Sequence, residues 1–433
     1  MEHQMKLTID YTRKAGTVRR LNGVNLAPPP IAEKASRDLS ADFAALRAPY
    51  ARLHDAPLEN GNMRLVDVPF LFGNCDADAA DKANYYFRQT DDYLATCRRC
   101  GSDVIYRLGV SIEHGIGRYY AFPPEDFEKW SDICVNIVRH YNEGWNDGFA
   151  WNIRYWEIWN EPDLAGNMWN APLERYFELY ALTAKKLKAR FPGIRVGGPA
   201  YACSDPGRIN AFLDACRAAD APLDFFSWHC YTADPAEIAA QPARVRALLD
   251  AKGFTGTELH LNEWHYFNAD WKKLRSDARY CREVHTGADG INGIDAAAFA
   301  VSVLTRWQDT PLDLGNYYTA TVMQGWGLFD NYGIPFKTYH ALKAFGELAG
   351  GARFRAASPS PEVTVLAGDG AVLVSRFKST KPVSVVFEGG MPERMQVHLL
   401  DREHDLEPVA AEPAGNVLAL PGEGSAVWLI ATA

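Results

Sequence analysis

The chain has 433 residues, of which 47% are hydrophobic and 23% charged, and its formal net charge is −9. This composition supplies one large apolar core and a smaller second one. The acidic balance, with no long run of Lys or Arg, argues against nucleic acid as a partner. No stretch approaches the length of a membrane span, and residues 1–14 lack an apolar segment with a cleavage site. We therefore expect a soluble, cytoplasmic protein without a membrane partner.

The eight cysteines are expected to be reduced, because several lie in apolar patterns where a thiol behaves as a small hydrophobe. Cys97 and Cys100 form the sequence CRRC, which could be a redox pair. A redox unit of that kind needs a strand before it and the start of a helix at it. Both cysteines instead fall late in a helical pattern, which favours ordinary helix residues.

Short apolar segments alternate with amphipathic stretches from Leu21 to about Gly350, a pattern typical of βα units around a parallel sheet. Helices are clearest over 123–141 and 172–193, where aromatic and aliphatic residues recur at helical spacing. The predicted strands are Leu21–Leu26, Tyr50–His54, Asp103–Leu108, Ile153–Asn160, Ile194–Gly198, Phe225–His229, Glu258–Glu263 and a run near Leu314–Val322. Eight such units indicate an α/β fold of the (β/α)8 TIM barrel type. Neither GxGxxG nor GxxxxGK[ST] is present, so we expect no nucleotide cofactor.

Beyond Gly350 the chain changes to short alternating strands separated by Gly, Asp and Pro, which is typical of an antiparallel β-sandwich. The opening segment KLTIDY alternates in the same way, with Leu7 and Ile9 on one face. We therefore predict a barrel over residues 17–349 and a smaller β-sandwich domain built from both chain ends, residues 1–16 and 350–433.

Polar residues close four of the predicted strands, in the sequences RLHD, NE, HCY and NEWH that begin at positions 52, 160, 229 and 262. The site of a TIM barrel lies at the carboxyl ends of its strands, so Glu161 and Glu263 are expected at one mouth. Two carboxylates at such a mouth suit cleavage of a glycosidic bond. One protonates the leaving oxygen while the other, ionised, attacks the anomeric carbon.

The two carboxylates need different protonation states. Repulsion from an ionised neighbour would raise the pKa of the acid, whereas Arg52 and Tyr231 are expected to keep Glu263 charged. Glu157 lies on the same strand as Glu161 but too early to reach the mouth. We therefore expect Glu157 to be a buried structural carboxylate paired with an Arg or a Lys.

The residues at these strand ends resemble a known family. WNEPD after the fourth strand and LNEW at the seventh resemble the acid/base and nucleophile motifs of clan A retaining glycoside hydrolases. RLH at strand two, GGPA at strand five, DFFSWHCY at strand six and the sandwich from both ends extend the resemblance to nearly the whole chain. The pattern looks like glycoside hydrolase family 39, which includes β-xylosidases and α-L-iduronidases.

The resemblance implies that Glu161 is the acid/base and Glu263 the nucleophile. It also implies a substrate site formed by Asn160, as donor to the sugar 2-hydroxyl, with Arg52, His54, His229, Tyr231 and Trp326. The implied substrate is a short oligosaccharide or glycoside, cut at a terminal sugar of the β-xyloside type, and the family resemblance suggests a homo-oligomer. Two departures bear on the sugar: Asp55 replaces a usual glycine, and the long segment 57–87 follows strand two.

Other interpretations stay open at this point. A metal site could use His54, Asp55, His229, His260 and His265. HExxH is absent, however, and His260 and His265 should point to opposite faces of a strand, so we expect no metal. A barrel that binds carbohydrate without catalysis is a second alternative, and a glycosidase for an iduronide, galactoside or arabinoside is a third.

Five tryptophans near the predicted mouth could stack on sugar rings: Trp159, Trp169, Trp228, Trp264 and Trp326. Barrel cores also use tryptophan, so Trp326, in the Gly-flanked sequence QGWGLF, is the best candidate. Glu113 and His114, after strand three, are expected either to line a subsite or to belong to a surface loop.

Overall fold

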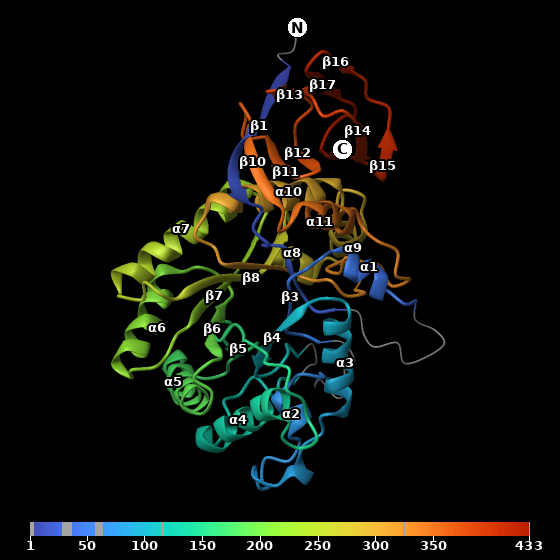
Figure 1. Cartoon of the computed structure of the whole chain (residues 1–433). Coiled ribbons are helices and arrows are strands. Elements are labelled where there is room, and N and C mark those ends of the chain that lie inside the picture. Colours follow the sequence, from blue (N-terminus) through green and yellow to red (C-terminus); the bar gives the residue numbers. More distant parts are fainter. Residues whose placement is uncertain (1–3, 28–36, 57–63, 114–116, 324, 433) are drawn as a thin grey trace.

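Eight parallel strands close into a barrel in the computed structural model, which describes residues 4–27, 37–56, 64–113, 117–323 and 325–432. The strands are β2 (Gly23–Asn25), β3 (Tyr50–Leu53), β4 (Asp103–Leu108), β5 (Tyr155–Ile158), β6 (Arg195–Tyr201), β7 (Phe225–Thr232), β8 (Glu258–Tyr266) and β9 (Leu314–Tyr317). They follow chain order, and β9 pairs with β2 to complete the circle. The predicted TIM barrel is confirmed (Figure 1).

All eight predicted strands are present, but several bounds were wrong. β7 and β8 extend beyond the predicted ends at His229 and Glu263, because the two strands continue to pair as far as Thr232 and Tyr266. β5 is shorter than predicted and ends at Ile158, since Trp159 adopts a left-handed φ of 71° that takes the chain out of the sheet.

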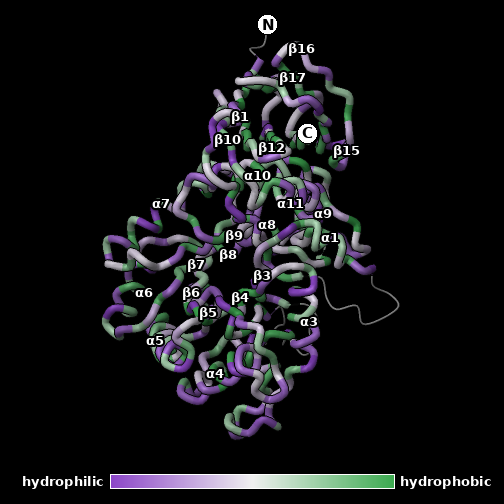
Figure 2. Tube along the Cα trace, in the orientation of Figure 1, coloured by the Kyte–Doolittle hydropathy of each residue, from purple (hydrophilic) through white to green (hydrophobic). Residues whose placement is uncertain are grey.

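The helices pack around the outside of the barrel. They are α1 (Ser40–Ala45), α2 (Val68–Leu71), α3 (Arg88–Arg99), α4 (Phe127–Glu143), α5 (Leu173–Arg190), α6 (Pro206–Ala218), α7 (Pro235–Ala251), α8 (Trp271–Ser276), α9 (Ala278–Thr286), α10 (Ile294–Arg306) and α11 (Lys337–Leu348), with 3-10 turns η1 (Lys82–Asn84) and η2 (Trp307–Asp309). Outer helices such as α4 and α5 carry both hydrophobic and hydrophilic residues in Figure 2, as helices with one buried face do. No helix in the described ranges is long and apolar enough to cross a membrane.

Local sequence fixes where these helices begin. Asp126 caps α4 by accepting a hydrogen bond from the Lys129 N–H at 3.0 Å, and Gly144 ends the helix with a left-handed φ of 73°.

Cys97 lies buried within α3 and Cys100 directly follows that helix, so both are ordinary helix-region residues as predicted. All eight cysteines are free thiols.

The second domain is a ten-stranded sheet to which both chain ends contribute (Figure 1). Its strands are β1 (Met5–Thr17), β10 (Ala352–Ala357), β11 (Val363–Gly368), β12 (Ala371–Arg376), β13 (Val383–Glu388), β14 (Met395–Leu400), β15 (Asp405–Val409), β16 (Pro413–Ala414), β17 (Val417–Leu420) and β18 (Ala426–Thr432). Leu7 and Ile9 of β1 are fully buried in a core shared with β11 to β14, β17 and β18. One expectation was wrong: β1 pairs antiparallel with β10 but parallel with β13, because this first strand is inserted between two strands from the other chain end.

Helix α10 lies between the barrel and this sheet. Nearly every side chain from Ile294 to Leu304 is buried, which is typical of a helix enclosed on all sides. The Ser375 hydroxyl of β12 donates to the Ala298 carbonyl at 2.7 Å, and Leu373 of the same strand belongs to the barrel core. The sheet thus packs against the barrel through α10, which also contacts β8, the strand carrying Glu263.

Candidate active site

A cavity of about 730 Å³ opens where the barrel strands end. Six of the eight predicted site residues line it: His54, Glu161, His229, Tyr231, Glu263 and Trp326. The other two, Arg52 and Asn160, are fully buried and are absent from the cavity lining. The structure therefore brings the predicted residues together, with these two beneath the cavity surface.

Glu161 is held at the mouth by an unusual backbone. Trp159 and Glu161 have left-handed φ values of 71° and 45°, which non-glycine residues rarely adopt. The Trp159 N–H donates to the Leu108 carbonyl at 2.7 Å, and the Glu161 N–H donates to the Ala200 carbonyl at 2.9 Å. These bonds to β4 and β6 fix the acid immediately after β5.

Glu263 reaches the cavity from within a strand. The register between β7 and β8 pairs Trp228 with Leu261 and then His229 with Glu263, so Asn262 is an extra residue in the ladder. An insertion of this kind is a β-bulge, which redirects the side chains beside it. The bulge explains how Glu263 lines the cavity although β8 continues as far as Tyr266.

Arg52 connects the buried polar groups below the cavity. Its Nη1 donates to Glu263 Oε1 at 2.7 Å, its Nη2 to Asn160 Oδ1 at 2.6 Å, and its Nε to Glu157 Oε2 at 2.7 Å. Glu157 also accepts a hydrogen bond from the Ser227 hydroxyl at 2.7 Å. Glu157 is thus a buried carboxylate paired with an arginine, as its position predicted, and Arg52 contacts Glu263 and Asn160 without lining the cavity.

The contacts of Glu263 and Asn160 suit different tasks. The Tyr231 hydroxyl donates to Glu263 Oε2 at 2.7 Å, so each carboxylate oxygen of Glu263 has a donor, Arg52 or Tyr231. The Asn160 amide oxygen is occupied by Arg52, which leaves its Nδ2 without a partner among the described residues. The Nδ2 of Asn160 lies beneath the cavity lining, so its role as donor to the sugar 2-hydroxyl stays a prediction.

The two glutamates and His229 form a compact cluster. A carboxylate oxygen of each glutamate and a ring nitrogen of His229 all lie within 4.8 Å of one another. His229 Nδ1 lies 2.8 Å from Glu161 Oε1 and 3.4 Å from Glu263 Oε2. Burial lowers the pKa of His229 to about 4, so the ring is neutral at pH 7 and bridges the acids without adding charge.

Burial separates the two glutamates further. It raises the pKa of Glu161 to about 8, and the nearby Asp163 contributes by repulsion. The leading cause is therefore desolvation, whereas repulsion by the other glutamate was expected. Burial also raises the pKa of Glu263, but the Arg52 guanidinium opposes that rise. Glu161 accordingly holds a proton at neutral pH, while Arg52 and Tyr231 stabilise the ionised form of Glu263.

His54 and Asp55 form one wall of the cavity. His54 is almost fully buried, and desolvation lowers its pKa well below the usual value. Asp55 adopts a left-handed φ of 55°, a conformation suited to the glycine expected at this position. Its Oδ1 accepts the Ile112 N–H at 3.0 Å and its Oδ2 accepts the Tyr318 hydroxyl at 3.2 Å. The departure from the family pattern is thus built into the cavity wall.

Aromatic rings form another part of the cavity lining. Trp326 and Trp271 line the cavity with parallel rings 5.9 Å apart, and Phe267 stacks on Trp271 at 4.1 Å. The other four candidate tryptophans, Trp159, Trp169, Trp228 and Trp264, are buried in the core. Sequence reasoning missed Trp271, which is 46% exposed, although an aromatic residue shortly after a strand carrying a site glutamate was an available signal.

The histidines proposed above as an alternative metal site do not all come together in the structure. His260 stacks on Phe225 at 4.3 Å inside the barrel, and His265 binds the Tyr317 hydroxyl at 2.8 Å, so neither joins His229. The group of described residues that could hold a cation is instead Glu161, His229 and Glu263.

Glu113 does not line the cavity; its carboxylate accepts the N–H groups of Tyr119 and Tyr120 and orders a loop. His114 lies outside the described residues.

The barrel and the paired glutamates at its strand ends define the class of TIM-barrel glycoside hydrolases. The chain belongs to Glycosyl hydrolases family 39, whose family model matches residues 112–367, more than half of the sequence.

Curated relatives match a shorter part. A stretch of 114 residues is 40% identical to a β-xylosidase of Geobacillus stearothermophilus, covering 26% of this chain and 22% of that protein. A stretch of 116 residues is 35% identical to a β-xylosidase of Caldicellulosiruptor saccharolyticus, covering 26% and 23%. The chain thus aligns with less than a quarter of the length of these relatives.

Solved structures show the same fold over the whole chain. A glucosidase from Croceicoccus marinus superposes with a TM-score of 0.81 at 21% identity, covering 100% of both chains. A family 39 β-xylosidase from Caulobacter crescentus gives a TM-score of 0.71 at 19% identity, covering 99% of both chains.

Proposed function

We propose that the chain is a retaining exo-glycosidase that removes a terminal sugar of the β-xyloside type from short oligosaccharides. The observation that carries the proposal is the approach of the two acids, since one carboxylate oxygen of Glu161 lies within 4.8 Å of one of Glu263. Retaining enzymes hold the two carboxyl groups about 5–5.5 Å apart, whereas inverting enzymes leave about 6.5–9.5 Å for a water molecule. The spacing supports direct attack by one of the glutamates.

In the proposed first step, Glu263 attacks the anomeric carbon while Glu161 gives its proton to the leaving oxygen. The glycosidic bond breaks, and an ester bond forms between the sugar and Glu263. In the second step Glu161 takes a proton from water, the oxygen of that water attacks the anomeric carbon, and Glu263 leaves as a carboxylate. The pKa of about 8 at Glu161 supports its role as proton donor in the first step. The hydrogen bonds that Arg52 and Tyr231 donate to Glu263 support its role as an ionised nucleophile.

The sugar class rests on similarity. Two curated relatives are named β-xylosidases, and they supply the preference for a xyloside. The Croceicoccus marinus structure described above is named a glucosidase, which keeps a glucoside as the second candidate sugar. A panel of aryl glycosides that differ only at C5 and C6 would separate the two, because a xyloside lacks the C6 group.

The double displacement is tested by trapping the intermediate. A 2-deoxy-2-fluoro-xylosyl fluoride should inactivate the enzyme and leave its sugar on the peptide that contains Glu263, as peptide mass spectrometry would show. NMR of the first product formed should show the same anomer as the substrate. Release of the opposite anomer, or a label on another residue, would disprove the proposed roles.

Variants assign the two acids separately. Glu161→Gln and Glu263→Gln should each abolish turnover of a glycoside with a poor leaving group. With an aryl glycoside whose good leaving group departs without an acid, azide should restore turnover to Glu161→Gln but not to Glu263→Gln, because the small anion can replace the water that Glu161 activates but not the nucleophile. The matched control is Glu237→Gln, which also lines the cavity but pairs with Arg244, and it should retain turnover.

A metal-dependent reaction is the second candidate, because Glu161, His229 and Glu263 are close enough to hold one cation. Dialysis against a chelator distinguishes the two proposals. Full activity after dialysis supports the double displacement, whereas activity that is lost and then restored by zinc would replace it.

A further inference from the structure

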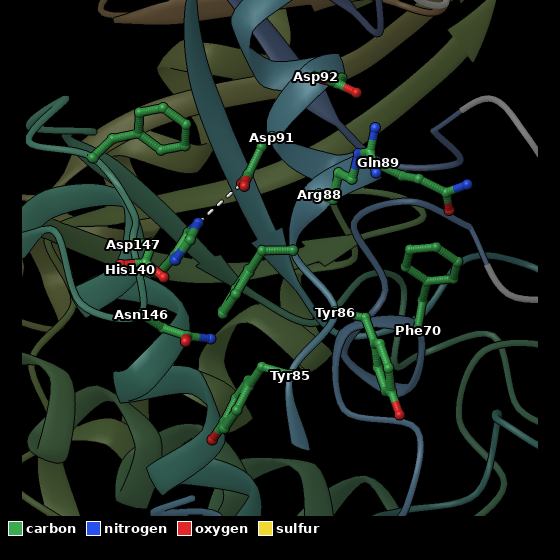
Figure 3. A pocket seen from close by; sticks show the side chains of 12 residues that line it. Phe70, Tyr85, Tyr86, Arg88, Gln89, Asp91, Asp92, His140, Asn146 and Asp147 are labelled. Atoms are coloured by element: carbon green, nitrogen blue, oxygen red, sulfur yellow. Dashed lines mark hydrogen bonds and ion pairs between the residues drawn. The ribbon is translucent and has the colours of Figure 1, made fainter. Parts of the chain in front are cut away.

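A second cavity, of about 700 Å³, lies on the outside of the barrel and shares no lining residue with the active site. Its walls come from α2, the segment before α3, the first turn of α3, His140 of α4 and the loop after α4 (Figure 3). The family match begins at residue 112, so the wall from Phe70 to Asp92 precedes the matched region. The segment 57–87, which the sequence marked as a departure, contributes Phe70, Tyr85, Tyr86 and Phe87 to this cavity.

Aromatic rings make up the floor and one side of this outer cavity. Tyr85, Tyr86 and Phe87 follow one another, and the first and third are buried while Tyr86 is 64% exposed. Phe87 lies flat on His140 at 3.6 Å with an angle of 4° between the rings, so the floor is rigid. Figure 3 shows Tyr86 beside Phe70 on one side of the cavity and Asn146 across from them. The exposed Tyr86 ring is available for stacking.

Polar side chains surround these rings. Asp91 binds His140 Nε2 at 3.0 Å and is held in place. Four others have no hydrogen bond or ion pair with any residue in the described ranges: Arg88, Gln89, Asp92 and Asp147. The loop that carries Asp147 is fixed, because Gly148 packs so closely on the His140 carbonyl that a Cβ there would lie 2.1 Å from the oxygen. The cavity thus offers carboxylate acceptors together with guanidinium, amide and hydroxyl donors.

We infer that this outer cavity is a second carbohydrate site, which binds a neutral β-linked oligosaccharide away from the catalytic glutamates. The C–H face of a sugar stacks on an exposed aromatic ring, and its hydroxyl groups need acceptors such as carboxylates and amides. Asp91, Asp92 and Asp147 outnumber Arg88, so phosphate or another anion is disfavoured. The site goes beyond the proposed catalytic roles, and it depends only on the membership of a carbohydrate-active family.

A ligand in the outer cavity would hold a longer chain on the enzyme. Arg64, at the start of the described part of the same segment, lines the active-site cavity, whereas Phe70 and Tyr86 line the outer one. Asp67, between them, is tied to the barrel by the Arg107 guanidinium at 2.6 Å. One continuous segment therefore forms part of both cavities.

Binding is best measured on Glu161→Gln, which binds sugars without cleaving them. Titration of this variant with xylotetraose, and separately with cellotetraose, should show two sites per chain for at least one of them. Adding Tyr86→Ala should weaken the second site by about tenfold, the loss expected for one aromatic stack. Tyr332→Ala, which removes a tyrosine that is 82% exposed and lines neither cavity, should leave both sites unchanged.

The outcomes separate this inference from the proposed function. A single site for both tetrasaccharides, or a second site that survives Tyr86→Ala, would overturn the inference. A tetra-arginine peptide that binds in a Tyr86-dependent way while neither sugar does would reassign the cavity to a cationic ligand. Tyr86→Ala alone should hydrolyse a small aryl glycoside at the wild-type rate, and failure of the wild type to hydrolyse any glycoside would count only against the proposed catalytic function.

Discussion

Replacing Glu161 by glutamine should stabilise the protein, and by an amount that depends on pH. A glutamate ordinarily titrates near pH 4.5, whereas burial raises the pKa of Glu161 to about 8. Between these values the folded chain holds a proton that the unfolded chain has released. The free energy of unfolding therefore falls as pH rises through this range, because the unfolded state binds fewer protons.

The magnitude follows from the same pKa. Each pH unit in this range costs about 1.4 kcal/mol, so retention of the proton at Glu161 destabilises the fold by roughly 3 kcal/mol at pH 7 and by very little at pH 4.5. Glutamine has nearly the shape of the neutral acid and does not titrate. Glu161→Gln should thus unfold at higher urea concentration than the wild type at pH 7 and at the same concentration at pH 4.5.

Urea unfolding of both proteins at the two pH values measures this difference. Glu237→Gln is the control, since its side chain is 46% exposed and its replacement should change stability by less than about 0.5 kcal/mol at either pH. Equal stability of wild type and Glu161→Gln at pH 7, or the same difference at both pH values, would refute the argument that burial keeps Glu161 protonated.

Three further predictions address the surroundings of the pair. Turnover should decline above about pH 8, where Glu161 loses its proton. Asp163→Asn removes a like charge beside Glu161 and should move that decline to lower pH. A pH profile that does not move would contradict this prediction. Arg52→Met should lower the free energy of unfolding by roughly 3–5 kcal/mol at pH 7, because Glu157 and Glu263 would lose their buried cation, whereas Arg154→Met, at a pair whose arginine is 54% exposed, should cost under about 1 kcal/mol. Trp271→Ala should reduce kcat/KM for oligosaccharides about tenfold through KM, with unfolding unchanged within about 1 kcal/mol, and an unchanged KM would remove Trp271 from the substrate site.

The sequence predicted the barrel and the convergence of Glu161 with Glu263, because hydrophobic periodicity and strand order determine both. It also predicted that Arg52 and Tyr231 contact Glu263 and that Glu157 is structural, since alternation along a strand decides which side chains share a face. The fold and the face on which each strand residue lies both follow from backbone geometry, and the pattern of hydrophobic and polar residues in a short segment predicts that geometry.

Other features depend on contacts between distant segments. The bulge at Asn262 arises from the pairing of β7 with β8, and nothing in LNEW indicates it. The dominance of burial in the pKa of Glu161 depends on how deep the mouth is, which the loops decide. The sorting of five tryptophans into four core residues and one cavity residue likewise requires coordinates, because core and site use the same residue type.

The position of β1 has a consequence for the order of folding. During synthesis Leu7 and Ile9 emerge before the barrel, yet their neighbours β10 and β13 are synthesised more than three hundred residues later. Contacts of such long range form slowly. Until they form, unpaired apolar strands can associate with other chains. We therefore expect nascent protein to aggregate most readily during this interval, and a circular permutation that places β1 next to the later strands should raise the soluble fraction of newly synthesised protein.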